Sequence, residues 1–557
     1  MSETWAVKVD ALFRGNFTTF DHRHPRAVLI AVLGGRIVAM DDEAEALEAP
    51  VQEDFGQCAV FPGFHDAHCH TAAFGLGLSE VDLSSPPLTS LEGLYAAVAE
   101  RAAGLRPGDW VVGSGFDQNK LGGSHPSGQR LDVAAGGRPV WLKHTSGHMC
   151  VVSSAVLAMI GSAADDPIEG GRVATGSSGE PTGLLEEKAQ SLVQRLRQAP
   201  SVEQIAAAIG QAHQRYLSEG LTSVCEAGVG GGWVSQSPLE LSAYQLARDS
   251  GRLGVRTTAM ISASVLHELG GNADGALVGA PNDGLTRVGL DAGIRSGLGD
   301  EWLRIGALKV FSDGSLIGRT CWMHDGFADD AGNTGYPQAD PAEMRATILD
   351  AHAAGWQVAT HAIGDAAVDF VLDCYSEALR KMPRADHRHR IEHCGVADDV
   401  AVAEMAALGV IAVPQGRFVG EIGDGMMAAL GQQRVPRAYR LRSLLDAGII
   451  LPGSSDRPVV DGRPLLGIRD MVSRSTQSGA PFSPSEALTA EQALYAYTVG
   501  SAVPTRSEHE RGRLAPGMLA DFAVLAADPR EVPPAEISDV PVVATVVGGE
   551  MVFRSLQ

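Results

Sequence analysis

The sequence predicts an α/β protein whose main part is a closed (β/α)8 barrel of the TIM type. Three observations carry this prediction. The chain has 557 residues, which is too long for one simple hydrophobic core. From residue 200 onward, a helical segment, a glycine and a short apolar strand with a polar end recur. No GxGxxG motif opens a helix, which removes the main reason to prefer a Rossmann fold.

The recurring unit sets the number of strands. A glycine in the left-handed conformation is expected at the end of a helix, and in most units an apolar run follows it. Segment 390–394 has the same character behind a polar loop, and a further strand ends near residue 70. These segments make eight strands, which favours a closed barrel over an open sheet. The glycine-led segments are 221–226, 255–261, 307–313, 356–365, 410–415 and 449–456.

Both ends of the chain are rich in β-strand signals. Gly34-Gly35 separates two apolar runs, and Gly548-Gly549 does the same near the other end, which is a hairpin pattern. We therefore expect one composite β-sandwich domain from residues 1–60 and 505–557, flanking a barrel of residues 61–504. The expected strands are Trp5–Phe13, Ala27–Leu33, Arg36–Met40, Ala520–Ala526, Val540–Val547 and Glu550–Phe553.

The stretch that follows the first barrel strand is rich in Gly, Ser and Pro, and its pattern is irregular. Helical periodicity is clear only at 91–105 and 184–196. We interpret residues 75–200 as a subdomain inserted into the barrel, next to the site that the first strand opens.

The charge balance and the cysteine pattern narrow the function classes. Acidic residues outnumber basic ones by 67 to 44, and the net charge of −23 argues against nucleic-acid and anionic-membrane partners. The seven cysteines are scattered singly, as expected for reduced thiols in a cytoplasm. No apolar leader follows a basic start, and no run approaches the ~20 apolar residues of a membrane span. We therefore expect a cytoplasmic protein, and the sequence leaves a homo-oligomer open.

The strongest chemical signal is the segment Phe61–His70, in which His68 and His70 follow a Pro-Gly turn. Successive side chains of a strand alternate faces, so these two imidazoles point the same way. Two imidazoles on one face can chelate one metal ion, whereas the same spacing on a helix would splay them apart. A bare HxH is more often a pair of surface or hydrogen-bonded histidines, so the interpretation depends on partners elsewhere in the chain.

Polar residues at the ends of other predicted strands supply such partners, because catalytic residues of a barrel lie at the C-terminal ends of its strands. Each also has a structural explanation when taken alone. Lys309 could pair with Asp313, His361 could be a core histidine, and His393 and Asp456 could cap helices. Polar groups at the same end of five strands are costly for folding unless they satisfy one another or a metal, so we favour a metal site. The candidate ligands are His68, His70, Lys309, His361, His393 and Asp456.

The ordered motifs of the chain resemble those of the amidohydrolase superfamily, and within it the YtcJ-like group that includes N-substituted formamide deformylases. The resemblance covers essentially the whole length. It implies a metal-bearing barrel, a composite β-sandwich and an insert after the first barrel strand. The motifs that carry it are Gly35–Val38, Pro62–His70, His125–Asp132, Gly179–Gly183, Lys309–Gly314, His361–Asp365, Ile391–His393, Ser455–Asp456 and Gly512–Asp521.

The resemblance also implies roles for the candidate ligands. The HxH pair and Asp456 would hold the more buried ion. His361 and His393 would hold a second ion, and Lys309, carboxylated by carbon dioxide, would bridge the two. Imidazole and carboxylate ligands suit Zn²⁺, with iron, manganese or nickel as alternatives, and one or two ions would be bound per chain.

The implied activity is hydrolysis of an amide-type carbon–nitrogen bond, other than a peptide bond, in a small molecule such as an N-substituted formamide or a related N-acyl compound. A metal lowers the pKa of bound water to about 7, which gives hydroxide at neutral pH. Asp456 would take the water's proton and later pass it to the leaving amine, as general base and acid. Lys309 and His393 complete the predicted catalytic set.

Several residues near the predicted barrel mouth are candidates for substrate contact. Arginines and aromatics there could bind an anionic or aromatic substrate, or could be surface residues without a role. Two histidines spaced i, i+4 flank Thr-Ser-Gly, which indicates a loop, so a lid or substrate contact is a better interpretation than a metal site. The candidates are Arg319, Trp322, Arg417, Phe418, His144 and His148.

Two alternative functions remain open. A deaminase on the same barrel usually has a Glu three residues after the histidine of the fifth strand, and Gly364 occupies that position here. This counts against deamination. A non-catalytic, amidohydrolase-like structural protein would have lost metal ligands, and no ligand position is lost in this sequence.

Overall fold

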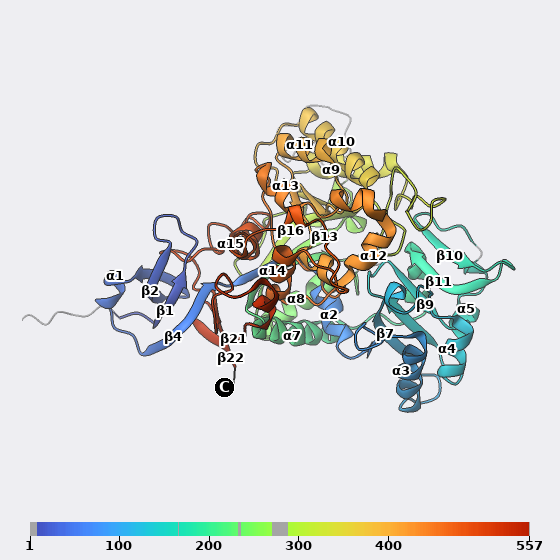
Figure 1. Cartoon of the computed structure of the whole chain (residues 1–557), viewed down its shortest axis with the longest axis horizontal. Helices are drawn as coiled ribbons and strands as arrows, with labels where there is room; N and C mark the ends of the chain where they lie inside the picture. The colour runs from blue at the N-terminus through green and yellow to red at the C-terminus, as the bar shows by residue number, and fades with distance from the viewer. Residues whose placement is uncertain (1–7, 165, 232–234, 270–287, 556–557) are drawn as a thin grey trace, which may run out of the picture.

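The computed structural model describes residues 8–164, 166–231, 235–269 and 288–555. The first residues of the predicted strand Trp5–Phe13 therefore lie outside the described residues. Figure 1 shows a central α/β body, with a β-sheet built from the chain ends on one side and a third sheet on the other. No helix among the described residues is long and apolar enough to cross a membrane.

The central sheet has seven strands in the order β19-β18-β17-β16-β13-β12-β5, and each neighbouring pair is parallel. The strands are almost entirely buried, as expected for a parallel sheet covered by helices. They are β5 (Phe64–Cys69), β12 (Leu221–Val229), β13 (Arg256–Ser262), β16 (Leu303–Phe311), β17 (Val358–Ala362), β18 (Arg390–His393) and β19 (Ile411–Val413).

The eighth predicted strand, residues 449–456, is not a strand in the structure. Pro452 has no N–H to donate to a ladder, and Gly453 follows it, so a regular strand is disfavoured here. The segment still bonds to β5, since Ala67 N donates to Gly453 O at 2.9 Å and Asp456 N donates to His68 O at 2.7 Å. Ser454 Oγ also donates to Pro414 O, just beyond β19. The segment therefore spans the gap between the two edge strands, and the barrel is nearly closed.

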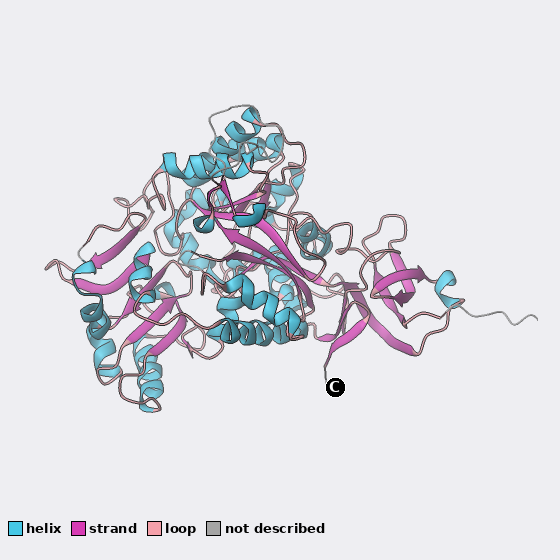
Figure 2. Cartoon of the chain, turned by 180° about the vertical axis from the view of Figure 1, so that it is seen from behind, coloured by secondary structure: helices cyan, strands magenta, loops and turns pink. Residues whose placement is uncertain are grey.

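Helices alternate with these strands and bury their apolar sides against them, as Figure 2 shows from behind. Local signals fix several ends: Ser201 and Gln204 form a capping box at the start of α7, and Gly409 ends α11 with φ of 70°. The prediction that Gly306 ends a helix and precedes a strand at residue 307 was wrong, because Gly306 lies inside β16 (Leu303–Phe311). The helices are α7 (Val202–Ser218), α8 (Glu240–Asp249), α9 (Pro341–Ala353), α10 (Asp365–Lys381), α11 (Asp399–Leu408), α12 (Gly416–Arg434), α13 (Leu441–Asp446), α14 (Pro464–Ser473) and α15 (Ala490–Tyr495).

The two ends of the chain meet in one seven-stranded sheet of order β22-β21-β20-β4-β1-β2-β3. β20 pairs antiparallel with the end of β4, which leads directly into the barrel, and the rings of Phe13 and Phe522 pack 5.1 Å apart in its core. The division into a sandwich domain with the expected boundaries stays a prediction. The strands are β1 (Ala11–Thr18), β2 (Arg26–Leu33), β3 (Arg36–Met40), β4 (Val51–Pro62), β20 (Phe522–Leu525), β21 (Val542–Val547) and β22 (Glu550–Arg554).

A six-stranded sheet of order β10-β11-β9-β8-β7-β6 lies in the chain between β5 and β12. The expected irregular structure was therefore wrong, and so was the helix over 184–196, because β11 continues to Glu187 before the short helix α6 (Ser191–Gln194). The other strands and helices of this inserted segment are β6 (Val81–Asp82), α3 (Leu91–Ala103), β7 (Val111–Phe116), α4 (Gly128–Ala134), β8 (Val140–His144), β9 (Met149–Val152), α5 (Ser154–Ile160), β10 (Gly171–Thr175) and β11 (Pro181–Glu187).

Candidate metal centre and its cavity

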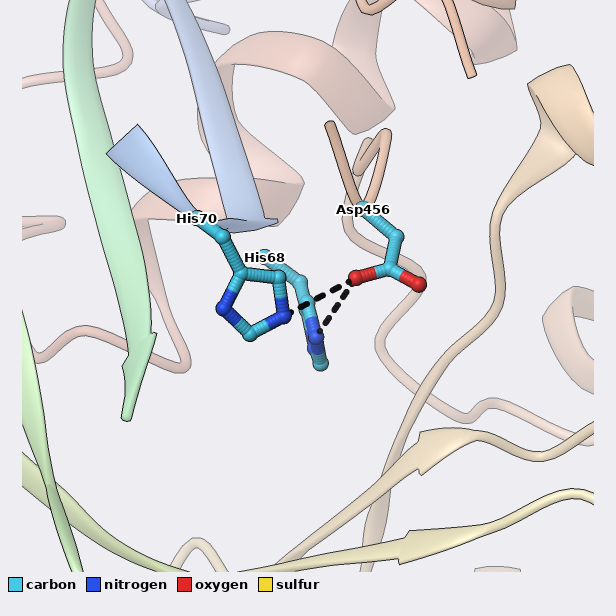
Figure 3. Close-up of side chains that lie close together, drawn as sticks. All are labelled: His68, His70 and Asp456. Atoms are coloured by element: carbon cyan, nitrogen blue, oxygen red, sulfur yellow. Dashed lines mark ion pairs between the residues drawn. The ribbon is translucent and has the colours of Figure 1, made fainter. Parts of the chain in front are cut away.

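Three of the candidate ligands converge at the C-terminal end of β5. His68 and His70 direct their Nε2 atoms at the same carboxylate oxygen, Oδ1 of Asp456, at 3.3 and 3.2 Å (Figure 3). One ligand atom from each of the three residues lies within 4.8 Å of the others. Asp66, on the same strand, accepts hydrogen bonds from the backbone and hydroxyl of Ser455, so β5 and the segment carrying Asp456 are held together.

His68 is fixed by a carboxylate behind it. Its Nδ1 bonds to Glu392, and Glu392 is itself held by Arg390 through two hydrogen bonds of 2.6 and 2.8 Å. All three side chains are fully buried, and Arg390 also donates to Ala67 O. A carboxylate on Nδ1 places the proton there and leaves Nε2 as the ligand atom, which is the usual arrangement for a metal-binding histidine.

His70 has a looser support of the same kind. Its Nδ1 lies 3.7 Å from Oε1 of Glu226, at the C-terminal part of β12. The other oxygen of Glu226 is anchored by Thr71 N at 2.7 Å and by the hydroxyl of Tyr244. Both histidines of the HxH pair therefore have a buried carboxylate on the side away from Asp456.

The other candidate ligands surround this cluster. The ring of His393 lies 4.9 Å from that of His68 and 4.5 Å from that of His361, centroid to centroid. His393 Nδ1 is 4.0 Å from Oδ2 of Asp456, so the two carboxylate oxygens face different histidines. His361 Nε2 bonds to Gly314 O at 3.0 Å. Within the described residues, Nζ of Lys309 is buried without a hydrogen-bond partner.

The backbone is strained at two of these positions. His393 and Asp456 have φ values of 69° and 59°, in the left-handed region that residues with a Cβ rarely adopt. Such strain costs of order 1–3 kcal/mol and concentrates at functional sites. The surrounding hydrogen bonds hold it in place here: Gln415 Oε1 lies 2.8 Å from His393 Nδ1, and Asp456 N donates to β5.

The electrostatics of the site match its burial. Burial lowers the pKa of Lys309 to about 8, although the carboxylates of Glu392 and Asp456 act in the opposite direction. Burial alone would raise the pKa of Asp456, but the close approach of His68 and His70 to its carboxylate, together with His393, holds that pKa well below its ordinary value. The site thus combines a carboxylate that stays ionised with an amine that loses its proton unusually easily.

A cavity of about 1180 Å³ opens over the candidate centre. All six candidate ligands line it, together with His144, His148 and Arg417. The two histidines differ in their bonding. His144 has both ring nitrogens bonded to Ser146 and Gln118, whereas His148 bonds through Nδ1 to Glu187 at 2.7 Å and packs its ring 5.0 Å from that of His361. The turn after β8 therefore brings His148 to the centre.

Three predicted substrate residues do not line this cavity among the described residues. Arg319 pairs with Asp329, and the ring of Trp322 packs 5.7 Å from that of Phe370. Phe418 is buried and stacks 6.2 Å from His393, so it packs behind a candidate ligand. Sequence position after a strand placed these side chains near the rim, but it could not say which way each one points.

The comparisons with known proteins agree with this geometry. A sequence profile described as the amidohydrolase family matches residues 53–553. The chain belongs to the amidohydrolase family. It is 31% identical over 511 residues to YtcJ of Bacillus subtilis (strain 168), a protein whose name classes it as an amidohydrolase, with 89% of each chain covered. It is 30% identical to the N-substituted formamide deformylase of Arthrobacter pascens, with 98% of each chain covered.

The fold also has solved counterparts. A crystal structure titled as an uncharacterized metal-dependent hydrolase from Pyrococcus horikoshii superposes with a TM-score of 0.71 at 23% identity, covering 94% of this chain and 99% of that one. At this level of identity the likeness concerns the fold. It supports the nearly closed barrel as the framework that presents the His-His-Asp cluster.

Two functional residues were missed by the sequence reasoning. Glu392 and Glu226 support the HxH pair, yet they were treated only as parts of a motif and a strand. The sequence did hold a signal for Glu392. Arg390 and Glu392 are two residues apart in one strand, so their side chains lie on the same face, and a buried charge needs a partner. The partner of Glu226 follows the neighbouring strand β5, which is far away in the sequence, so no local pattern could reveal it.

Proposed function

We propose that this chain is a metal-dependent hydrolase that cleaves an amide-type carbon–nitrogen bond other than a peptide bond, in a small N-acyl compound such as an N-substituted formamide. The observation that carries the proposal is the His68–His70–Asp456 cluster at the C-terminal end of parallel strands, on the wall of a large cavity. Membership of the amidohydrolase family and the likeness to a formamide deformylase support the reaction type.

The donor set fits a divalent metal. Two imidazoles and a carboxylate are ligands that suit Zn²⁺, with iron, manganese or nickel as alternatives. His68 Nε2 is fully buried and makes no hydrogen bond within the described residues. A buried polar atom without a partner costs folding free energy unless it coordinates a ligand such as a metal ion. We assign one ion to the His68–His70–Asp456 cluster.

A second ion would be held by His361 and His393. Lys309 lies beside them with a buried amine that has no hydrogen-bond partner among the described residues. Its lowered pKa favours the neutral amine, the form that carbon dioxide can carboxylate. The carboxylated side chain would supply two oxygens as a bridge. A bare ammonium at this position would be a buried charge without a hydrogen-bond partner among the described residues.

When bound, such an ion polarises the scissile carbonyl and lowers the pKa of a water molecule to about 7. The chain's own residues then move the proton. Asp456 Oδ1 faces the HxH pair, so Oδ2 is the oxygen that takes a proton from the attacking water and returns it to the leaving amine. Glu392 and Glu226 keep the two imidazoles in the orientation this requires.

The deaminase alternative finds no support in the geometry. A deaminase of this kind would need a glutamate at position 364, but a Cβ on Gly364 would overlap the carbonyl oxygen of Trp322. The glycine is instead fixed by its N–H bond to Asp313 at 2.8 Å. No side chain larger than hydrogen fits there without moving that loop.

The test begins with elemental analysis of protein purified without chelators. We expect one or two transition-metal ions per chain, and hydrolysis in a screen of N-formyl, N-acyl, carbamate and cyclic amide compounds. His70→Gln should lose metal, whereas His387→Gln should keep it. His387 does not line the cavity, and its Nε2 bonds to Leu408 O at a distance of 2.9 Å. A clean absence of metal, or no hydrolysis by metal-replete protein, would overturn the proposal.

A further inference from the structure

The cavity wall carries many charged side chains, and they are paired with one another. Lys143 Nζ lies 2.6 Å from Oε1 of Glu80. Arg457 pairs with Glu219 at 2.7 Å and with Asp461 at 3.0 Å. These pairs lie on both sides of the cavity, since Lys143 comes from β8 of the inserted sheet and Arg457 follows Asp456.

The remaining basic residues of the wall are compensated in the same way. Arg463 pairs with Asp461 at 2.9 Å, and Arg469 pairs with Asp470 at 2.7 Å. Arg215 bonds to Glu219 at 2.8 Å. Apart from Lys309, each Lys or Arg that lines the cavity in the described residues therefore has a carboxylate partner.

Arg417 shows how complete this compensation is. Its Nη1 donates to Asp470 and its Nη2 to Glu421, both at 2.6 Å, while Nε donates to Asp461 O at 3.3 Å. The side chain is buried, and both edges of its planar guanidinium are in use. A carboxylate or phosphate on the substrate would have to displace one of these carboxylates and break a short charge-assisted hydrogen bond.

Beyond the charged pairs, apolar side chains line the cavity together with neutral polar ones such as Thr145 and Gln190. Phe74, Trp141, Val459 and Leu466 line the cavity, and the ring of Phe311 lies 4.7 Å from Lys309 Nζ. The exposed carboxylate of Asp82 accepts a bond from Ser84 N. Apolar walls with a few oriented polar groups are typical of sites for small uncharged ligands.

We propose that the substrate is an amide without net charge, whose apolar group lies along this wall, and that Glu80 is a specificity-determining residue because it cancels the charge of Lys143. The proposal rests on the proposed function, whose site it deepens. It also replaces the sequence-based option of an anionic substrate, because Arg417 is fully paired and Arg319 does not reach the cavity.

The test compares two amides that differ by one carboxylate, N-formylbenzylamine and N-formyl-4-(aminomethyl)benzoate, on metal-replete protein. We expect kcat/KM to favour the neutral amide by at least about tenfold, because the carboxylate would be left without a free cation. Glu80→Gln should raise the relative kcat/KM of the anionic amide by about fivefold, a modest factor since the pair with Lys143 is partly exposed.

A matched control is Glu377→Gln on helix α10, which removes a carboxylate from a pair with Arg345 of α9, outside the lining of the cavity. This variant should leave the ratio unchanged. Equal or better turnover of the anionic amide by the wild type would overturn the proposal. An unchanged ratio in Glu80→Gln would overturn the role of Glu80.

A second arm does not depend on hydrolysis. Calorimetry would measure binding of two ketones that cannot be hydrolysed, 4-phenyl-2-butanone and 4-(3-oxobutyl)benzoate. Preference for the neutral ketone with no amide hydrolysed would support the charge inference while the proposed function fails. Equal binding of the anionic ketone, or no binding of either ketone at millimolar concentration, would overturn the inference.

Discussion

Histidines lie at both ends of β18, and the two groups to which they belong differ in how their ring nitrogens are used. The rim cluster, His68, His70, His361 and His393, lies at the C-terminal ends of the strands. The floor cluster, His352, His387 and His389, lies at the opposite ends. His389 directly precedes β18 and His393 ends it, so only three residues of the chain separate the two environments.

Every ring nitrogen of the floor cluster has a partner. His389 Nδ1 accepts from Val358 N at 3.0 Å and its Nε2 bonds to His352 Nδ1 at 2.8 Å. The other nitrogen of His352 donates to Met382 O, and His387 accepts from His389 N and donates to Leu408 O. These bonds fix all three tautomers as neutral rings. The floor cluster is structural, in the sense expected of buried polar groups.

The rim cluster uses its nitrogens differently. His68 is bonded on one side only, and its other nitrogen faces the carboxylate of Asp456 together with that of His70. Strained φ values also occur here, at His393 and Asp456. Within the described residues, burial is similar in the two clusters, so burial alone does not mark a site. The distinction lies in the ring nitrogens of His68 and His70, which converge on one ionised carboxylate.

The largest effect should come from the carboxylate at the centre of the rim cluster. Asp456→Asn keeps the size and a ligand oxygen, but it cannot accept a proton from the attacking water. We expect turnover to fall by at least about 10²–10⁴-fold. Metal content and thermal melting of the same samples should change little, because the amide oxygen of Asn can still bind a metal and the side chain fills the same space. Near-normal turnover would make Asp456 a structural residue.

The supports of the HxH pair should give the next largest effect. Glu392→Gln weakens the hold on His68 and leaves Arg390 partly uncompensated, so metal affinity should fall by about 10–100-fold. Glu226→Gln is the matched comparison, and its effect should be smaller because His70 lies 3.7 Å from Glu226. Isothermal titration calorimetry with the metal ion measures the metal affinity of both variants. Equal losses would mean that the two supports are not distinguished by distance.

The floor cluster should make the free energy of unfolding sensitive to acid. The variants at Asp456, Glu392 and Glu226 should leave this sensitivity in place. Burial lowers the pKa of His352 to about 4, and nearby Arg384 and His387 act in the same direction. The folded-state pKa is depressed, so the neutral ring contributes stability above about pH 6.5 that is lost as pH falls towards 4. At pH 5 the loss should be about 2 kcal/mol.

His352→Gln is the variant that tests this. Gln can bond to both neighbours of His352 without titrating, so its free energy of unfolding should fall less between pH 7 and pH 5 than that of the wild type. Denaturant unfolding at the two pH values provides the measurement. Parallel losses in both proteins would show that His352 does not contribute to acid sensitivity.

The rim cluster could be predicted from the sequence better than the floor cluster could. HxH after Pro-Gly and polar residues at strand ends are local patterns, and they led to the cluster of His68, His70 and Asp456. The floor cluster depends on His352 at the end of α9 meeting His389 before β18, which only the packed fold brings together. The support Glu226 was missed for the same reason, whereas Glu392 had a local signal in its spacing from Arg390.

The barrel itself was predicted with two kinds of error. The glycine rule worked where the glycine truly ends a helix, as at Gly409, and failed at Gly306, because glycine also occurs within strands. The last strand failed because Pro452 and Gly453 interrupt the ladder, although the segment still fills the strand's place beside β5. The sheet of the inserted segment was not predicted, because its strands are short and are separated by glycine-rich turns.

The smallest effect should come from a side chain that the sequence placed near the rim and the structure places elsewhere. Arg319 bonds to Asp329 and to Ile317 O, outside the cavity that the rim cluster lines. Arg319→Ala should leave KM within about twofold and cost no more than about 1 kcal/mol of stability, as expected for an exposed pair and one backbone bond. Arg417→Ala is the contrasting variant, because it removes a buried guanidinium that bonds to both Asp470 and Glu421 on the cavity wall. It should raise KM and lower the melting temperature together. A large rise in KM for Arg319→Ala would mean that the loop of Arg319 turns into the cavity when substrate binds.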